Sequence, residues 1–156
     1  MSKGFYPPVG FHFKVSFLPG IFTEKDNAFQ EVSGISMELE TEDIREGGTQ
    51  YSAHKVPKQT KFEDLVLKRG LVTMASPLAL WCFNTLGNST MIPIVPQIIT
   101  LQLLDDMKIP KMAWSFHDAY PFKWEVSGFN AQENNIVVES MSFKYNYFMV
   151  LPLGGL

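Results

Sequence analysis

The residue types that most often perform chemistry are few in this chain and widely spaced. The chain holds three histidines, His12, His54 and His117, and one cysteine, Cys82. The histidines have no Cys or His partner at the spacing of zinc ligands, so we expect them at the surface or hydrogen-bonded rather than at a metal. Cys82 lies in an apolar segment with no nearby cation, where a thiol behaves as a small core residue and not as a nucleophile.

A row of glutamates offers a second kind of site. Glu38, Glu40 and Glu42 recur at every second position, so on a strand they share one face. Such a face can gather a cation, but a solvated acidic surface is the more common outcome and the one we expect.

Two pairs of turn-forming residues complete the set of chemical candidates. Asp105 and Asp106 end an alternating segment and suit the capping of a turn better than a metal. Gly47 and Gly48 are followed by neither the Lys-Ser pair nor the helix of a phosphate-binding loop, and they suit a bend. No catalytic set emerges, so we expect no enzymatic activity, no cofactor and no bound metal.

Composition describes one folded domain that spans residues 1–156. Hydrophobic residues make up 46% and charged residues 19% of the chain, which is typical of a globular protein. A net charge of −3 with only two arginines argues against a surface that neutralises nucleic-acid phosphates. A single cysteine excludes an internal disulfide, and the first residues lack the apolar stretch of a secretory signal, so we expect synthesis and retention in a cytosol.

Charge is absent from one long part of the chain. Residues 71–104 are thirty-four positions without Asp, Glu, Lys, Arg or His. Pro77, Pro93 and Pro96 interrupt every apolar stretch long enough to cross a bilayer, so we expect no membrane-spanning segment. The run must be buried in protein, and one small core does not need all of it, so we expect part of it to face another copy or a partner. The side chains expected at that contact are Trp81, Phe83, Met91, Ile92 and Val95.

Alternation of apolar and polar residues predicts a mainly β fold with a single helix. Six segments have the period of a strand with one buried face, and a seventh is weaker. The six are 11–17, 35–40, 99–103, 112–117, 120–126 and 141–147, and the seventh is 62–69. The helix is predicted from its end residues, because Ser76 with Pro77 is typical of a helix start and Gly87 of a helix end. Its sequence is apolar nearly all round, so it needs cover on more than one side.

Three connecting or terminal segments stand apart from these elements. Residues 41–61 are polar and contain two adjacent glycines, which predicts an extended hairpin or a mobile arm that leaves the body. Residues 87–97 form an apolar loop with two prolines, which stays exposed unless something packs on it. The tail at 149–156 is very apolar for a chain end and suits docking on a neighbour or another partner.

Five phrases in fixed order carry a resemblance to a known family. They are YPPVGFHFKVSF at 6–17, FQEVSGISMELE at 29–40, TEDIREGG at 41–48, VLKRGLV at 66–72 and AYPFKWEVSGFNAQENNIVVESM at 119–141. Together they resemble the contractile phage tail tube family, most closely the inner tube proteins of extracellular contractile injection systems and tailocin-like particles. The resemblance extends over roughly residues 5–148.

The resemblance implies a fold and an assembly. It implies an antiparallel β-sandwich or barrel-like body with one α-helix and an extended hairpin arm, which closes through its sheet into a hexameric ring. It also implies that residues 41–61 reach the next ring, with contacts from Arg45, Glu46, Gly47, Gly48, Tyr51, His54 and Lys55. The resemblance does not settle which side chains line the bore. Polar strand faces must meet water, so the candidates are Glu38, Glu40, Ser142, Lys144 and Asn146.

The function that follows is a structural subunit whose stacked hexameric rings form the hollow inner tube of a contractile injection system or phage-like tail. The expected partners are further copies of the chain, a contractile sheath protein, baseplate or spike and tube-terminator proteins, and a protein toxin or DNA as cargo in the lumen. The implied setting is a bacterial or archaeal cytoplasm and a particle that is then released or membrane-docked. The alternative, drawn from the aromatic strands, is a monomeric β-barrel that binds a small molecule.

Overall fold

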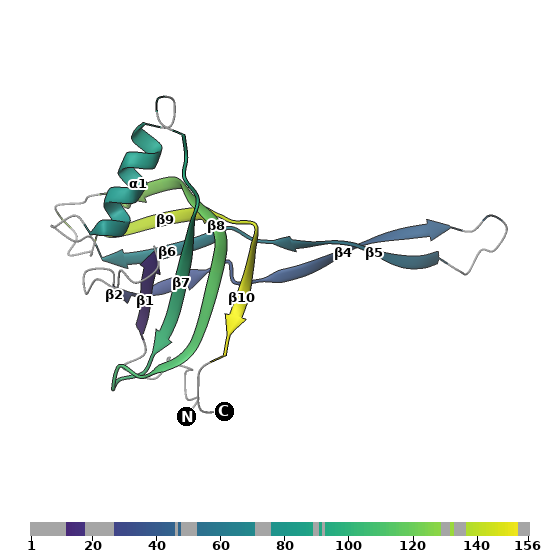
Figure 1. Cartoon of the computed structure of the whole chain (residues 1–156), viewed down its shortest axis with the longest axis horizontal. Helices are drawn as coiled ribbons and strands as arrows, with labels where there is room; N and C mark the ends of the chain where they lie inside the picture. The colour runs from purple at the N-terminus through teal and green to yellow at the C-terminus, as the bar shows by residue number, and fades with distance from the viewer. Residues whose placement is uncertain are drawn as a thin grey trace.

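The computed structural model describes residues 12–17, 27–45, 47, 53–70, 76–88, 91, 93–128, 132 and 137–152. In this part of the chain there are ten strands and one helix (Figure 1). The strands are β1 (His12–Phe17), β2 (Asn27–Phe29), β3 (Glu31–Ser33), β4 (Met37–Arg45), β5 (Ala53–Phe62), β6 (Leu65–Gly70), β7 (Gln97–Leu104), β8 (Pro110–Val126), β9 (Val138–Lys144) and β10 (Tyr147–Leu151), and the helix is α1 (Pro77–Gly87). The prediction of a mainly β chain with one helix is confirmed.

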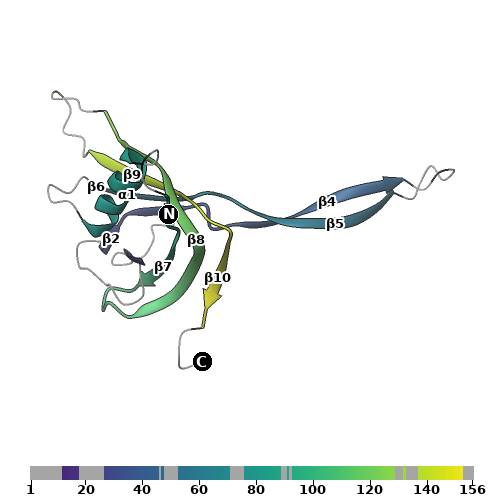
Figure 2. The same ribbon diagram turned by 45° about the horizontal axis from the view of Figure 1, so that its top comes forward.

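The body is an antiparallel sheet that curls into a barrel-like shape. Its strands follow the order β2-β1-β7-β8-β9-β6-β3, and β10 pairs with β8 off this path. Only Gln30 separates β2 from β3, and its backbone amide donates to the Lys68 carbonyl on β6 at 2.9 Å. The two ends of the path are therefore brought together by one short stretch of chain, and Figure 2 shows the resulting curl along β7 and β8.

Strand β8 is a single long strand where the sequence predicts two. Its first half pairs with β7 on one side and β10 on the other, and its second half pairs with β9. Asp118 marks the corner with a φ of 55°, and its carboxylate accepts a hydrogen bond from the Asn146 side chain at 2.8 Å. Asn146 lies in the break between β9 and β10, so the predicted strand 141–147 is wrong at its end. Each half of β8 takes its own partner strand at this corner.

The helix begins and ends close to its predicted limits. Ser76 is the N-cap, and its hydroxyl accepts a hydrogen bond from the Ala79 amide at 3.1 Å. Pro77 opens the first turn, where a missing amide hydrogen costs nothing. Gly87 is the last helical residue, and the cap that follows is Asn88.

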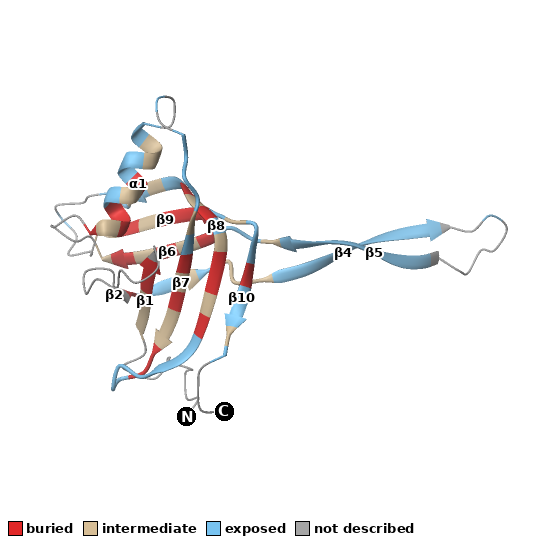
Figure 3. Cartoon of the chain, viewed as in Figure 1, coloured by how far each residue is buried: buried red, intermediate tan, exposed pale blue. Residues whose placement is uncertain are grey.

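The core lies between the curled sheet and one face of α1. Figure 3 places the buried residues on the inner strands and on the side of the helix that faces them. Leu78 and Cys82 on α1 are fully buried, which confirms the prediction that Cys82 is a core residue. The largest side chains that fill the interior are Phe29, Phe116, Phe143, Leu65, Leu67, Ile99, Leu101 and Met141. No helix in the described part of the chain is long and apolar enough to cross a membrane.

Strands β4 and β5 form a separate two-stranded hairpin that projects from the body (Figure 1). The predicted arm at 41–61 is thus confirmed as an extended hairpin, with strands that begin at Met37 and end at Phe62. The alternation at 35–40 predicts a buried face there, and this is wrong, because Met37 and Leu39 are 61% and 53% exposed. The strand has left the body before it reaches these residues, and its apolar side finds no cover within the chain.

Candidate functional site

Among the described residues, the side chains that could bind a metal or act in catalysis do not come together in one site. In the described part of the chain no group of three or more His, Cys, Asp or Glu side chains gathers to hold a metal. His117 lies on β8, where its Nε2 is 3.0 Å from the Ser115 hydroxyl and its ring stacks on Tyr147 at 4.5 Å between centroids. These contacts fix the imidazole within a sheet surface, which agrees with a hydrogen-bonded structural histidine.

Asp105 caps the turn between β7 and β8, as the sequence predicts. Its Oδ1 accepts hydrogen bonds from the backbone amides of Met107 and Ile109, both at 2.9 Å. The bond from Ile109 is the main cause that lowers the pKa of this carboxyl below 3.8, and desolvation works against it. Lys111 adds an ion pair at 3.5 Å. The carboxylate therefore serves to stabilise the turn in which it lies.

The hairpin is the first surface that a single chain leaves incomplete. Figure 3 shows it exposed along its length, and its apolar side chains Met37, Leu39, Ile44 and Val56 lie on the surface. A two-stranded hairpin alone in water is at best marginally stable. Its length and its exposed apolar residues therefore indicate that another molecule covers it. Of the residues predicted for contacts in the arm, Glu46, Gly48 and Tyr51 lie outside the described residues, as does the side chain of Arg45, whereas Gly47, His54 and Lys55 are exposed.

The root of the hairpin is fixed by a close approach of two backbone segments. Gly34, just before β4, has a φ of +91°, and a Cβ built on it would lie 1.8 Å from the Asp64 carbonyl oxygen. Only glycine fits there without moving the chain. At the end of β5, the Phe62 ring packs against Tyr145 and Phe148 at centroid distances of 5.9 and 5.5 Å. The hairpin thus leaves the body in a defined direction.

Charged groups surround this root. Lys144 donates to the Asp64 carboxylate at 2.9 Å, and its ammonium lies 4.6 Å from the centre of the Phe122 ring. The Tyr145 hydroxyl donates to the Gly34 carbonyl at 3.4 Å. Burial, together with the nearby carboxylates of Asp64 and Glu63, raises the pKa of Tyr145 to about 12. The phenol therefore stays protonated and serves as a donor to the root.

A buried ion pair holds α1 to the sheet, and local sequence signals do not reveal it. Arg69 on β6 and Glu139 on β9 are 2% and 3% exposed, and Arg69 Nε donates to Glu139 Oε2 at 3.1 Å. Arg69 Nη2 donates to the Ser76 hydroxyl at 2.6 Å, and Trp124 Nε1 donates to the other Glu139 oxygen at 2.8 Å. The guanidinium also lies 4.8 Å from the centre of the Phe29 ring. One charge network thus joins the helix cap to three strands.

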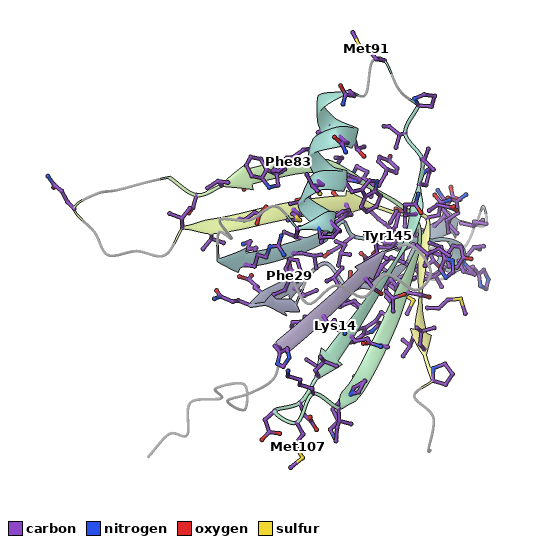
Figure 4. The ribbon with its side chains drawn as sticks, turned by 60° about the vertical axis from the view of Figure 1, so that its left-hand side comes forward. Lys14, Phe29, Phe83, Met91, Met107 and Tyr145 are labelled. Carbon is purple, nitrogen blue, oxygen red and sulfur yellow. The ribbon has the colours of Figure 1, made fainter. Side chains whose placement is uncertain are left out.

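The second incomplete surface lies around α1 and the loop after it. Phe83 and Val95 are exposed, and Met91, which lies beyond the end of α1 in Figure 4, is 87% exposed. Trp81, in contrast, stacks on Phe143 at 5.8 Å and packs against the core, so much of it is used within the chain. Ile92 lies outside the described residues. A shallow groove of about 210 Å³ beside the helix is lined by Trp81, Asn84, Thr85, Pro93, Ile94, Val95 and Gln97.

The third incomplete surface is the free edge of β10. Among the described residues this strand pairs only with β8, and Met149 and Val150 on it are exposed, whereas Phe148 is buried. An edge of this kind presents unpaired backbone groups to another strand. The predicted apolar tail at 149–156 therefore begins as part of the sheet, and its last residues, 153–156, lie outside the described residues.

The sheet β1-β7-β8-β10 also has a polar face that the sequence analysis missed. Strand register places Ser16 beside Thr100 and Thr100 beside Ser115, and it places Lys14 beside Gln102. These side chains lie opposite to the core positions on the same strands; Lys14, Thr100 and Gln102 are half-buried, and Ser16 and Ser115 are buried at 6% exposure. Their alternation with core residues is visible in the sequence, but only the strand register shows that side chains from different strands form one continuous face.

The side chains predicted to line a bore lie elsewhere. Glu38 and Glu40 are on β4 in the hairpin, and Lys144 and Asn146 are exposed near its root. Ser142 is 9% exposed, so its side chain offers little surface to water. Their role in a lumen stays a prediction. Together, an edge strand, exposed apolar side chains around α1 and a projecting hairpin indicate that other chains complete this one.

Comparisons with known proteins give the following matches. The family model for the T4-like virus tail tube protein gp19 matches residues 9–149. No curated protein gives a significant match. A chain of the anti-feeding prophage baseplate, solved by cryo-EM with 6-fold symmetrisation, is 28% identical over 91% of this chain and 92% of that chain, with a TM-score of 0.73. A chain of the PVC sheath-tube complex, from an extracellular contractile injection system in the extended state, is 22% identical over 94% and 91%, with a TM-score of 0.70. Hcp1 from Flavobacterium johnsoniae is 13% identical over 89% and 94%, with a TM-score of 0.55, which is a likeness of fold.

Proposed function

The chain belongs to the T4-like virus tail tube protein family and is a structural tube subunit, and from this premise we propose that its copies form stacked hexameric rings. The stacked rings make the hollow inner tube of a contractile injection system or phage-like tail. The observation that carries the proposal is the family match over residues 9–149, which spans the body and the hairpin.

Ring closure uses the free edge of β10. A copy related by rotation brings a different strand to that edge, so the contact is heterologous and can close into a ring. Closure removes the exposed edge and covers Met149 and Val150. The exposed side chains Phe83, Met91 and Val95 around α1 are covered by a neighbouring copy or by a sheath subunit.

The polar face of β1-β7-β8-β10 lines the bore. It is the face opposite the core, and we infer that its half-buried members Lys14, Thr100 and Gln102 face the bore, whereas Ser16 and Ser115, each 6% exposed, offer little surface there. Four strands from each of six copies make about twenty-four strands, which at about 4.8 Å spacing and a tilt near 40° form a circle about 48 Å across. Side chains reduce the opening to about 40 Å, which admits DNA or a small folded protein as cargo.

The remaining parts of the proposal concern partners and setting. The tube is made in a bacterial or archaeal cytoplasm, lies inside a contractile sheath, and ends at a baseplate or spike on one side and a terminator on the other. Solved relatives come from particles of this kind, namely a baseplate and a sheath-tube complex. The subunit acts by polymerising and conducting cargo, and it catalyses no reaction.

A ligand-binding barrel is disfavoured by the interior of the body. The core side of the curled sheet is occupied by fully buried side chains, among them Phe29, Phe116 and Phe143. A lipocalin-type site needs that space for its ligand. The aromatic residues that suggest this alternative therefore serve packing.

Electron microscopy of the purified protein tests the proposal. The full chain should form rings or tubes with a wide central hole, and deletion of residues 47–55 should leave single rings that no longer stack. Near-normal circular dichroism of the deletion variant would show that the body still folds. Tubes of ordinary length from that variant would contradict the role given to the hairpin, and a stable monomer of the full chain under all conditions would contradict the assembly itself.

A further inference from the structure

The two strands of the hairpin carry opposite charges. Strand β4 holds four carboxylates, with one arginine at its outer end, whereas β5 holds three lysines and a histidine and no carboxylate. The acidic residues are Glu38, Glu40, Glu42 and Asp43, and the basic residues of β5 are His54, Lys55, Lys58 and Lys61, all exposed. Charge on the hairpin is thus sorted by strand.

Sorting by strand gives the hairpin one acidic edge and one basic edge. The hairpin is a sheet of two strands, so in the part of the chain that the structure describes β4 and β5 each have an outer side with no strand beside it. Side chains of adjacent strands lie about 5 Å apart across a sheet, so a strand placed beside either edge meets that edge's charges directly. The two edges therefore attract different neighbours.

Pairing inside the hairpin leaves most of these charges unused. In the described part of the hairpin the one ion pair is between Lys58 and Glu42, at 3.6 Å, and both side chains are at least half exposed. Register sets Glu38 opposite Lys61, yet these two side chains form no ion pair. Exposed pairs of this kind contribute little to stability. Stabilisation of the hairpin alone is therefore a weak reason for the sorting.

We propose that the acidic β4 edge of one copy lies alongside the basic β5 edge of the next copy in the ring. The proposal rests on the ring assembly described above and adds a specificity determinant to it. Rotation about the ring axis points all hairpins the same way, so every β4 edge faces a β5 edge. A two-fold pair would place β4 against β4, where carboxylates repel. The charge pattern thus favours ring closure over dimers.

The hairpin is also protected from uncontrolled strand addition. Pro57 in β5 has no amide hydrogen to donate, and lysines on an edge discourage continuous pairing. Contacts between neighbouring hairpins are therefore made chiefly by charged side chains. Such contacts weaken with ionic strength, so assembly should require more protein at high salt.

Complementary charge reversal tests the proposal in the full-length protein. One variant carries Glu38→Lys, Glu40→Lys and Glu42→Lys, so both hairpin edges are basic. A second carries Lys55→Glu, Lys58→Glu and Lys61→Glu, so both edges are acidic. Each alone should need roughly tenfold or more protein to assemble than the wild type. An equimolar mixture should assemble near the wild-type concentration, because the two variants can alternate around an even-numbered ring.

Two controls make the outcome decisive. A variant with all six reversals has its edges exchanged and should assemble alone. Three reversals on exposed residues of the body, Glu31→Lys, Asp106→Lys and Glu125→Lys, change the net charge as the first variant does and should assemble far better than it. Assembly of either edge variant alone at the wild-type concentration would overturn the inference, as would failure of both the mixture and the six-fold reversal. If the wild type forms no rings, the ring assembly fails and the inference fails with it.

Discussion

Removal of the buried carboxylate at position 139 should cost the body a large part of its stability. Glu139→Leu deletes one partner of Arg69, which is 2% exposed and donates to Glu139 at 3.1 Å. It also removes the acceptor of the Trp124 indole N–H, which donates to the same carboxylate at 2.8 Å. The guanidinium keeps its bond to Ser76, but its charge is no longer balanced by that carboxylate.

The expected loss follows from the burial of the pair. Breaking a buried ion pair by removing one partner costs about 3–5 kcal/mol, because the remaining charge stays out of water. A domain of this size has about 5–15 kcal/mol of stability in total. We therefore expect Glu139→Leu to lower the unfolding free energy by about 4 kcal/mol and the melting temperature by about 10 °C.

The double variant Arg69→Met with Glu139→Leu separates charge from packing. It removes both ions and restores apolar volume, so it should be less damaging than Glu139→Leu alone, with a cost of about 1–2 kcal/mol from the hydrogen bonds lost by Ser76 and Trp124. Glu31→Leu is the matched control on the surface. It breaks the exposed pair with Lys68, at 3.8 Å, and should cost less than about 1 kcal/mol.

Urea unfolding of the four proteins, followed by tryptophan fluorescence at one protein concentration, measures these differences. Unfolding of Glu139→Leu at the same urea concentration as Glu31→Leu would show that the buried pair contributes no more than the exposed one. A double variant less stable than Glu139→Leu would also contradict this prediction, since the cost would then come from lost packing and not from the loss of one ion of a buried pair.

Three further outcomes are expected. Gly34→Ala should lower the unfolding free energy by at least about 2 kcal/mol in thermal unfolding, because its Cβ would lie 1.8 Å from the Asp64 carbonyl oxygen, whereas Gly47→Ala, with nothing within 4 Å, should be near neutral. Asp105→Asn should be less stable than the wild type at neutral pH. Because folding lowers the pKa of Asp105, the stability that the carboxylate adds is present above pH 3.8 and is lost as the pH falls below that value toward the lower pKa of the folded protein. A stability difference that does not change with pH would contradict the role given to this carboxylate. Val150→Lys on the β10 edge should leave a folded monomer by size-exclusion chromatography, and rings at wild-type yield would exclude this edge from the interface.

Local signals predict the body well where one face of an element is buried. Alternation identifies β1, β7 and β8, because their apolar positions face the core. Ser76 and Pro77 mark the helix start through capping chemistry that needs no tertiary contact. The same alternation misleads at Met37 and Leu39, since the hairpin offers no core to face. A period of two reports a strand with two different sides, and it cannot say what covers the apolar one.

The features that the sequence did not reveal depend on distant partners. Arg69 and Glu139 are 70 positions apart, and although both lie in phrases that carry the family resemblance, neither phrase shows that the two side chains pair. The corner in β8 depends on Asp118 and Asn146, which meet only when β9 and β10 flank the two halves of that strand. The charge sorting of the hairpin was present in the sequence, but the paired strands were needed to turn it into two edges.

A cryo-EM reconstruction of the assembled protein shows whether the copies form a ring and how they meet. We expect rings of six copies around an open bore, with the β10 edge against a neighbouring copy and hairpins that point one way, acidic edge beside basic edge. A solitary monomer that forms no higher assembly, or a closed two-fold dimer that buries the exposed apolar side chains around α1 and leaves the β10 edge free, would contradict this expectation.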